Sequence, residues 1–385
     1  MKKILISILF LIAVVHSAFA QSLQDIFAMI EQNNMSLKTY SARCNAAKLE
    51  ARTGTALADP EVEFGYLWGT PNGIGNRKDF SVTQSFDFAT VFGVKRREAQ
   101  NKEQLADLEC EQARNLVFFA AQQLAIDLTC VNKKLAEQKA RLASSIQLEN
   151  SYLSMFQKGE VSKIDVGRVQ LSHASTEAEL QSLMIEKESL QSKLSMMCAD
   201  EENSTSIVYD SNNYPAEYIK GDRSVSVSKQ EVDLASQQVA AAKAEGMPEL
   251  KAGYMSELTP GEKFRGITVG VSIPLWKNRN NTARAKAQQL LAQTATDELT
   301  HQLSEQRKEL QSKAQRLHAL LESLRSSLSS INTLALMQKA LEAGEISLID
   351  YINERSTYYE LQDKFIETEH EYQTAIAELS FISAE

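Results

Sequence analysis

Two long stretches of the chain combine a helical hydrophobic pattern with the absence of proline and glycine. They are Val94 to Lys158 and Lys277 to Ala343, and both are rich in residues that lose little rotamer freedom in a helix. Their apolar residues recur at steps of three, four and seven, so each helix needs a partner along a heptad-like seam. At about 1.5 Å per residue, an unbroken helix of this length would be roughly 100 Å long. The seam positions are Leu124, Leu128, Val131, Leu135 and Leu142 in the first stretch, and Leu299, Leu303, Leu310, Leu317, Leu321, Leu324, Leu328 and Ile331 in the second.

A period of two replaces the helical pattern ahead of each long stretch. Apolar and mainly polar residues alternate in Pro60 to Trp68 and in Phe80 to Phe88, with a Thr-Pro-Asn-Gly turn between them. Pro248 to Tyr254 and Ile267 to Leu275 repeat the alternation, with a Thr-Pro-Gly turn between them. The pattern therefore predicts two β-hairpins, each of which leads directly into a long helix.

The far end of each long helix carries the same short motif. Residues 159–165 (Gly-Glu-Val-Ser-Lys-Ile-Asp) match residues 344–350 (Gly-Glu-Ile-Ser-Leu-Ile-Asp), which indicates an internal duplication. Each glycine ends a long helix, and a helical return arm follows. We therefore divide the chain into two repeats joined by a connector, 201–229. The first repeat, 21–200, has a helix, a hairpin (60–88), a long helix (94–158) and a return helix (162–198). The second repeat, 230–385, has a helix, a hairpin (248–275), a long helix (277–343) and a return helix (347–383).

The first twenty residues predict a secretory signal peptide. Lys2 and Lys3 precede an apolar run, and Ala18-Phe19-Ala20 forms a small-x-small cleavage site. A membrane anchor is the alternative, but the apolar run is short for a membrane span. Cleavage removes two lysines and moves the formal charge from −9 to −11. An acidic chain with its basic residues scattered along helices argues against a nucleic-acid partner.

No cluster of residues in the sequence predicts an enzyme, a cofactor site or a metal site. The histidines after the signal each stand alone in helical sequence, and there is no Gly-rich phosphate loop or paired nucleophile and base. The four cysteines match no zinc or redox motif, so the sequence leaves disulfides and buried free thiols equally open. They are Cys44, Cys110, Cys130 and Cys198.

The four predicted strands have the length that a tilted strand needs to cross a bilayer. Four strands cannot close a barrel, and an open edge in lipid leaves unpaired backbone groups that cost several kcal/mol each. Several chains must then share one barrel, and three copies would give twelve strands. A small soluble sandwich is the alternative, although so little sheet makes a marginal core. The strand residues that we expect to face the membrane are Phe64, Tyr66, Trp68, Phe80, Val82, Tyr254, Val269 and Val271.

In this layout the chain resembles the TolC-like outer-membrane efflux channels, the outer-membrane components of tripartite efflux systems. The duplicated hairpin and rod, the strand ends at 82–88 and 271–276 and the two Gly-Glu-x-Ser-x-Ile-Asp turns carry the resemblance over residues 21–385. The resemblance implies an α+β membrane protein in which a homotrimer forms a twelve-stranded barrel in outer-membrane lipid, continued by a helical coiled-coil barrel through the periplasm. It also implies two protein partners, a periplasmic adaptor and an inner-membrane pump of RND type.

In that family the turns at the helical tips meet the adaptor, and acidic residues there narrow the entrance. The resemblance therefore places Asp165, Asp350 and Asn353 at the constriction, with Asn353 standing where relatives often carry a second acid. The turns resemble capping boxes as well, so the two aspartates also have a purely structural explanation. The residues that the resemblance assigns to adaptor contact are Gly159, Glu160, Ser162, Gly344, Glu345 and Ser347.

The predicted function is conduction of small molecules, drugs or metal cations, from pump and adaptor across the outer membrane. A periplasmic coiled-coil scaffold without a pore would explain the rods and the signal but not the four amphipathic strands. A type I protein secretion channel would share the same architecture, because the pump and the adaptor set the cargo.

Overall fold

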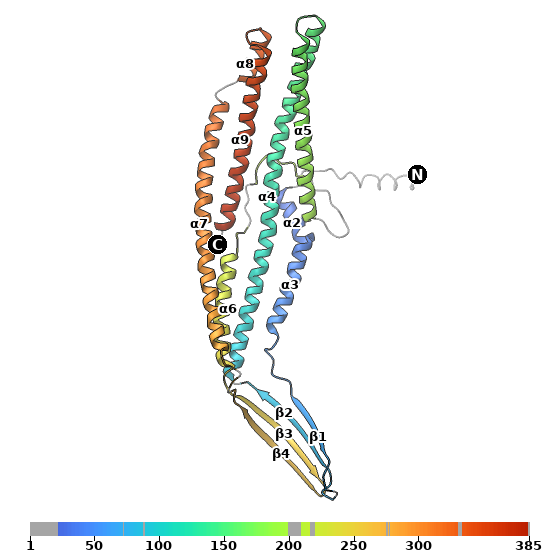
Figure 1. The fold of residues 1–385 in the computed structure, drawn as a ribbon, viewed down its shortest axis with the longest axis vertical. Helices are drawn as coiled ribbons and strands as arrows, with labels where there is room; N and C mark the ends of the chain where they lie inside the picture. Colours follow the sequence, from blue (N-terminus) through green and yellow to red (C-terminus); the bar gives the residue numbers. More distant parts are fainter. Residues whose placement is uncertain are drawn as a thin grey trace, which may run out of the picture. The chain divides into compact units, whose positions relative to one another are not determined.

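The computed structural model describes residues 22–71, 73–87, 89–198, 209–215, 220–274, 276, 278–329 and 333–383. The predicted signal peptide, residues 1–20, lies outside this part of the chain, as do portions of the predicted connector. Figure 1 shows helices and one sheet in the described residues. No helix in these residues is both long and apolar enough to cross a membrane.

The order of helix, two strands, long helix and return helix occurs twice, as the sequence pattern predicts. The first half contains α2 (Leu23–Asn33), α3 (Met35–Arg52), β1 (Glu61–Leu67), β2 (Arg77–Phe86), α4 (Ala89–Gln157) and α5 (Lys163–Cys198). The second half contains α6 (Ser224–Ala244), β3 (Glu249–Thr259), β4 (Glu262–Ser272), α7 (Asn281–Ser329), α8 (Thr333–Glu342) and α9 (Leu348–Ser383).

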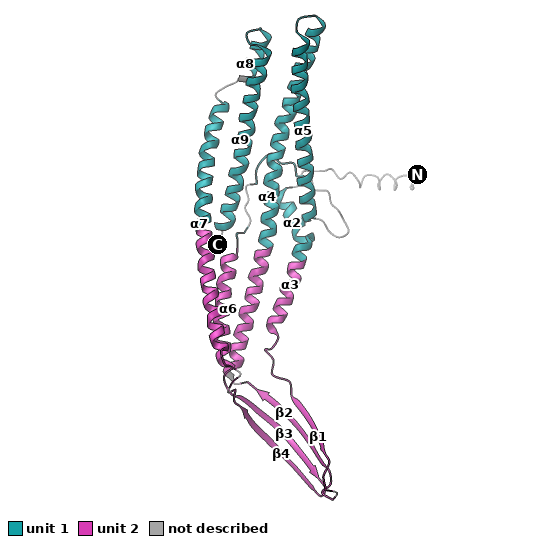
Figure 2. Ribbon diagram, viewed as in Figure 1, with its two compact units in different colours: residues 1–38, 114–222, 305–385 teal, residues 39–113, 223–304 magenta. Residues whose placement is uncertain are grey.

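The chain divides into two compact units, each built from segments of both halves of the sequence (Figure 2). Unit 1 consists of residues 1–38, 114–222 and 305–385, and unit 2 consists of residues 39–113 and 223–304. The long helices α4 and α7 contribute to both units. Division of the chain into two sequential domains therefore stays a prediction.

The core of unit 1 lies where α2 packs against α4 and α5. Ile26 and Ile30 of α2 are fully buried, together with Leu128 of α4 and Leu194 of α5. The amphipathic pattern of α2 explains this, since its two buried isoleucines are four residues apart on one helix face. Ser22 begins the helix by capping it, and accepts a hydrogen bond from the backbone N–H of Asp25.

The leucine seams that the sequence predicts are partly covered within the chain. On α4, Val131 and Leu135 pack against α5, and on α7, Leu310 and Leu321 are buried. Other seam positions remain only half-buried, among them Leu142 of α4. The single chain thus satisfies part of each seam and leaves the rest for further contacts.

Unit 2 contains one antiparallel sheet with the strand order β1-β2-β3-β4. β2 pairs with β3, so the two predicted hairpins join into a single sheet. The register aligns Val62, Val82, Tyr254 and Ile267 in one row across all four strands. Paired residues point to the same side of a sheet, so this row belongs to one continuous face.

A disulfide links α3 to α4 within unit 2, which settles the question that the sequence leaves open. Cys44 and Cys110 are bonded, with their Cα atoms 6.3 Å apart. Arg52 donates to Glu103 at 2.7 Å about two helical turns away, which adds an ion pair between the same helices. Cys130 and Cys198 in unit 1 are free and buried.

Several predicted boundaries are wrong. α4 begins at Ala89 rather than Val94 and contains Gly93. One glycine inside a helix costs roughly 1 kcal/mol, which is too little to end a helix of 69 residues. α6 begins at Ser224, inside the predicted connector, because Val225 and Ser228 are buried and tertiary packing outweighs the polar composition. The sequence also predicts a helix over 21–58 with a break at Asn33-Asn34; the break is confirmed at Asn34, but the helix ends at Arg52 rather than Ala58.

The second long helix, predicted over 277–343, is described as α7 and α8 with residues 330–332 outside the described part. It begins at Asn281, four residues later than predicted. The residue before it, Asn280, has a φ of 67°, a left-handed conformation that Asn tolerates better than most residues. This turn replaces the first predicted turn of helix.

Candidate functional site

The turns at the ends of the long helices have the same backbone geometry. Gly159 has a φ of 79° and Gly344 a φ of 73°, values at which a residue with a Cβ is strained. The N–H of Gly159 donates to the carbonyl of Phe156 at 2.9 Å, and the N–H of Glu160 donates to the carbonyl of Met155 at 2.9 Å. This is the Schellman pattern, in which orphan carbonyls at a helix end are satisfied.

The second turn repeats these bonds. The N–H of Gly344 donates to the carbonyl of Leu341 at 3.0 Å, and the N–H of Glu345 donates to the carbonyl of Ala340 at 2.8 Å. Each glycine therefore ends its long helix, as the sequence predicts.

Ser162 and Ser347 cap the helices that follow the turns, which confirms the capping interpretation. Ser162 Oγ accepts from the N–H of Asp165 at 3.2 Å, and Asp165 accepts from the N–H of Ser162 at 3.3 Å. Ser347 Oγ accepts from the N–H of Asp350 at 3.2 Å in the same way. Each serine hydroxyl also donates to its aspartate at 2.6 Å.

The two aspartates differ in their surroundings, although both share the bonds with their serine hydroxyls. Asp165 lies 3.3 Å from Arg168, and it is half-buried. The hydrogen bond from Ser162 lowers the pKa of the Asp165 carboxyl below its usual range, and Arg168 lowers that pKa further. Asp350 is exposed and has no ion pair within the described part of the chain. Of the two carboxylates, Asp350 is therefore the one whose charge is not balanced locally.

One small hydrophobic cluster holds both turns in unit 1. Tyr152 of α4, Val169 of α5 and Leu348 of α9 are buried together beneath them, with Leu341 of α8 packed alongside. Burial raises the pKa of Tyr152, and the negative charge of Asp165 raises it further. The phenol is therefore neutral at physiological pH, which suits a buried position. The cluster fixes the two tips as one structural feature of unit 1.

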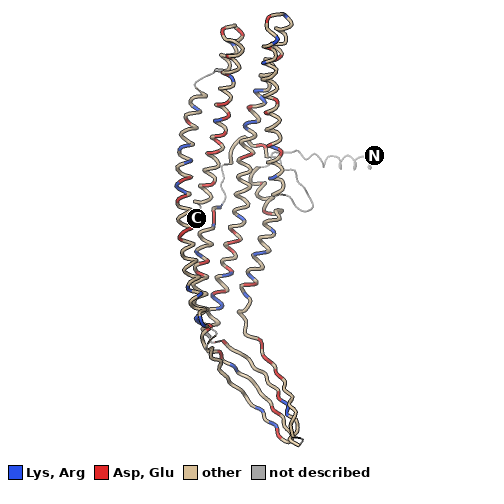
Figure 3. The backbone as a smooth tube through the Cα atoms, viewed as in Figure 1, with Lys and Arg blue, Asp and Glu red and all other residues tan. Residues whose placement is uncertain are grey.

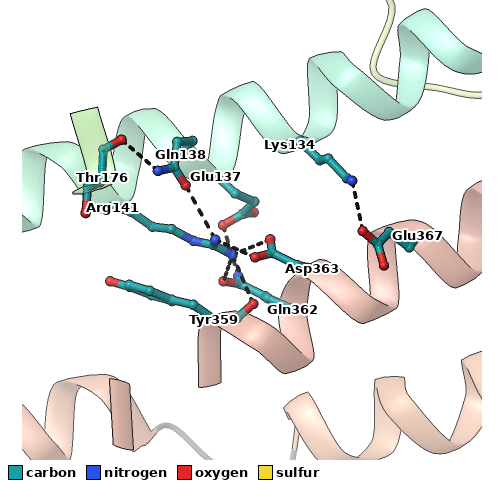
Figure 4. A network of polar contacts seen from close by, with 9 residues as sticks. All are labelled: Lys134, Glu137, Gln138, Arg141, Thr176, Tyr359, Gln362, Asp363 and Glu367. Atoms are coloured by element: carbon teal, nitrogen blue, oxygen red, sulfur yellow. Dashed lines mark hydrogen bonds and ion pairs between the residues drawn. The ribbon is translucent and has the colours of Figure 1, made fainter. Parts of the chain in front are cut away.

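Charged side chains connect α4 to α9 over several helical turns of unit 1 (Figure 4). Arg141 makes two hydrogen bonds of 2.8 Å to the carboxylate of Asp363 and stacks over the ring of Tyr359 at 4.4 Å. Lys134 pairs with Glu367 at 3.1 Å. Only 10% of the Arg141 side chain is exposed, although 41% of the Asp363 side chain is, and the paired hydrogen bonds make this contact geometrically specific. Further pairs between these helices are Lys133 with Glu369 and Asp127 with His370.

These pairs are not evident from the sequence, in which His370 stands alone in a helical stretch and no charged residue has an assigned partner. His173 likewise contacts Glu149. A signal was present in the spacing. Asp127, Lys134 and Arg141 are seven residues apart, a spacing that keeps side chains on one face of a packed helix. Their partners on α9 follow at steps of three and four, but only the knowledge that α4 packs against α9 connects the two series.

The residues predicted to face the membrane all lie on one side of the sheet, except Trp68, which follows the end of β1. The register pairs Phe64 with Phe80, Val82 with Tyr254 and Leu250 with Val271, so these side chains share a face. Val269 is on the same face, opposite Ala252. Tyr66 continues the alternation, and the ring of Trp68 lies edge-on to it at 5.3 Å. The face is exposed in the single chain, with Ile267 84% and Val269 78% accessible.

The predicted tip residues lie on elements different from those of the sheet face. Asp165 and Asp350 lie in the first turns of α5 and α9, and Asn353 follows Asp350 by three residues on the same helix face, exposed. The tips belong to unit 1 and the sheet face belongs to unit 2.

Solved structures with this fold include two outer-membrane channels and an outer-membrane protein. VceC from Vibrio cholerae has a TM-score of 0.78 at 14% sequence identity, and the match covers 94% of this chain and 96% of that one. CmeC from Campylobacter jejuni has a TM-score of 0.72 at 15% identity, covering 94% of this chain and 85% of that one. MtrE from Neisseria gonorrhoeae has a TM-score of 0.74 at 11% identity, covering 94% and 88%.

At these identities the similarity establishes the fold. No protein-family model matches the sequence, and no curated protein matches it.

Proposed function

We propose that this chain is the outer-membrane channel subunit of a tripartite efflux system, and that it acts as a homotrimer. The observation that carries the proposal is the sheet of unit 2, which exposes one apolar face across four strands. A soluble protein rarely leaves so continuous an apolar surface uncovered. The solved channels with the same fold support this interpretation.

The geometry of the sheet explains why several copies are needed. β1 and β4 are its edge strands, and each leaves a row of backbone groups unpaired. Unpaired backbone in hydrocarbon costs several kcal/mol per group, so a membrane sheet has to close. Three copies supply twelve strands, an even number within the range of single-chain outer-membrane barrels. The trimer and its barrel are thus the arrangement that satisfies both the edges and the apolar face.

The helices give a second reason for association. Leu290 and Leu291 of α7 are 61% and 68% exposed, and Ile164, Leu171 and Ile185 of α5 are also exposed. Coiled-coil packing against neighbouring copies would cover such positions. A ring of helices formed in this way would enclose a central path.

The polar face of the sheet would line the barrel. It carries six carboxylates and only two cations, so a trimer would present a strongly acidic lumen. A negative lumen favours the passage of cations over anions. We therefore infer a cation-preferring path and assign small molecules, drugs or metal cations, as cargo. The carboxylates are Glu61, Glu63, Asp79, Glu249, Glu257 and Glu262, and the cations are Arg77 and Lys251.

At the other functional region, we propose that the two tip turns form the entrance and contact a periplasmic adaptor, with an inner-membrane pump of RND type below. Exposed turns held by a rigid cluster suit a docking surface, since their backbone shape is fixed before binding. Asp350 is the best candidate for a charged constriction, because its carboxylate lacks the cation that Asp165 has. Asn353 would extend the same polar ring without adding charge.

Envelope fractionation followed by native mass measurement in detergent tests the channel assignment. We expect the protein in the outer-membrane fraction, released only by detergent, with the mass of three chains. A monomer or dimer released without detergent would reject the channel and favour the periplasmic scaffold. Copurification with a dedicated pump for a protein substrate would keep the channel and assign it to type I secretion.

Single-channel recording in a planar bilayer tests the role of Asp350. Asp350→Asn removes the charge and keeps an oxygen that can accept the capping bond of Ser347. We expect an altered conductance and a weaker preference for cations. Asp165→Asn is the matched control, because Arg168 already balances that charge and a smaller change is expected. An equal conductance and an equal cation preference for wild type and Asp350→Asn would show that Asp350 serves only to cap its helix.

A further inference from the structure

The sheet separates its charges between its two faces. Basic and acidic positions occur along the four strands (Figure 3). The register assigns all six strand carboxylates to the polar face. Three of the five strand cations, Lys78, Lys263 and Arg265, lie on the apolar face instead. The apolar face thus carries positive charge alone, which hydrophobic patterning by itself does not explain.

These three cations lie together at one end of the face. Lys78 is paired in register with Leu258, which is paired with Lys263, and Arg265 follows Lys263 by two residues on β4. Lys263 and Arg265 are about 7 Å apart along the strand, and Lys78 and Lys263 are about 10 Å apart across two strand spacings. Long basic side chains span such distances, so all three can reach one group or adjacent groups.

The three cations have no counter-charge within the described residues. Lys78, Lys263 and Arg265 are all exposed and form no ion pair there, and Lys78 contacts only the ring of Tyr66, at 5.7 Å. The neighbouring Arg77 provides the contrast. It points to the polar face and lies 2.8 Å from Asp79 and 3.0 Å from Glu257. Arg77 is therefore neutralised on the polar face, whereas Lys78, Lys263 and Arg265 keep their charge unbalanced on the apolar face.

The position of the cations identifies the kind of ligand. They lie at the hairpin end of the face, next to Tyr66 and Trp68, whose rings are typical of the boundary between hydrocarbon and headgroups. The rows on the other side, through Phe86, Leu250 and Val271, carry no charge. A surface that is apolar, then aromatic, then basic matches a lipid with acyl chains and an anionic headgroup.

We propose that Lys78, Lys263 and Arg265 bind the phosphate groups of lipids in the leaflet that surrounds the hairpin ends of the sheet. The inference rests on the proposed channel, since it requires the apolar face to lie in a bilayer. Arg offers planar paired donors to phosphate, and Lys offers a mobile point charge, so the set can hold phosphates of differing position. The acyl chains of the same lipid would lie against the apolar rows.

Native mass spectrometry of the delipidated, detergent-solubilised full-length protein tests the proposal. The probes are diphosphoryl lipid A and the same lipid after removal of its phosphates. We expect the wild type to prefer the phosphorylated lipid, and the K78Q/K263Q/R265Q variant to bind it about 100-fold more weakly. The charge-conserving variant K78R/K263R/R265K should retain the preference. Lys251→Gln, on the polar face of the same sheet, is the control and should bind as the wild type does.

The outcomes separate this inference from the proposed function. A wild-type trimer that binds both lipids equally would overturn the phosphate site and leave the channel in place. Equal binding of phosphorylated lipid by the wild type and by K78Q/K263Q/R265Q, both trimeric, would do the same. A wild type that leaves the envelope without detergent as a monomer would overturn both.

Discussion

A buried charge placed on the apolar face of the sheet should prevent assembly, and Val269 is the position that tests this most directly. Val269 lies on β4 between Ile267 and Val271, all on the apolar face. It is four residues from Arg265, about 13 Å along the strand. With strands tilted by about 40° in an apolar band about 25 Å tall, Val269 lies close to the middle of the bilayer if Arg265 marks its edge.

The expected cost follows from that depth. A lysine on the lipid face of a barrel near the bilayer centre costs about 2–4 kcal/mol, and a shared barrel places one on each of three chains. The trimer would lose roughly 6–12 kcal/mol, comparable with the whole stability of a typical domain. Thr268, the preceding residue, is opposite Gly253 on the polar face, and a lysine there would remain in water. We therefore expect V269K to abolish trimers and T268K to permit them.

The assay measures the yield of trimer in the outer-membrane fraction by native mass in detergent. Both variants add one positive charge to adjacent residues of one strand, so effects on strand propensity or net charge largely cancel. Normal trimer from V269K would show that this face does not meet lipid. An equal loss of trimer in both variants would show that β4 tolerates no lysine on either face, and it would contradict the assignment of one face to lipid and the other to water.

Three further expectations concern the helices. Replacing both Cys44 and Cys110 by serine opens a loop of 66 residues and should lower the free energy of unfolding of unit 2 by about 4 kcal/mol, measured by urea denaturation. Arg141→Ala leaves the carboxylate of Asp363 unpaired and should speed hydrogen exchange in α9 by about tenfold, and an unchanged rate would make the pair redundant. Burial raises the pKa of the Cys198 thiol to about 11, so at pH 8.5 this thiol should be alkylated about 100-fold more slowly in the native protein than in the unfolded protein. The stability that the thiol contributes should decline as pH rises from about 8.5 towards 11.

The sheet was the most predictable part of the fold. Strict alternation at Ile267, Val269 and Val271 forces one face to be apolar whatever the neighbouring strand is, so the face is a property of the sequence alone. The glycines that end the long helices were predictable for a similar reason. Gly159 and Gly344 adopt a backbone conformation that few other residues tolerate. In both cases the information is local.

Features that depend on two distant segments were not predictable. The pairing of β2 with β3 and the bond between Cys44 and Cys110 both require knowledge of which elements are neighbours. The same is true of the α4–α9 ion pairs, where Arg141 and Asp363 are separated by more than 200 residues. The candidate constriction combines a feature that can be predicted locally with one that cannot. The capping role of Asp350 is visible in the motif, but the absence of a cation beside it, which distinguishes it from Asp165, appears only in three dimensions.

The apolar face and the open strand edges make the stability of the sheet inseparable from assembly. Within one chain Val62, Tyr254 and Ile267 are exposed and Val82 in the same row is only half-buried, so this row adds little to the folding of unit 2 alone. Their contribution appears when neighbouring copies close the edges and lipid covers the face, and it then depends on protomer concentration. Substitutions in this row should therefore lower trimer yield far more than they change the helical content of the monomer.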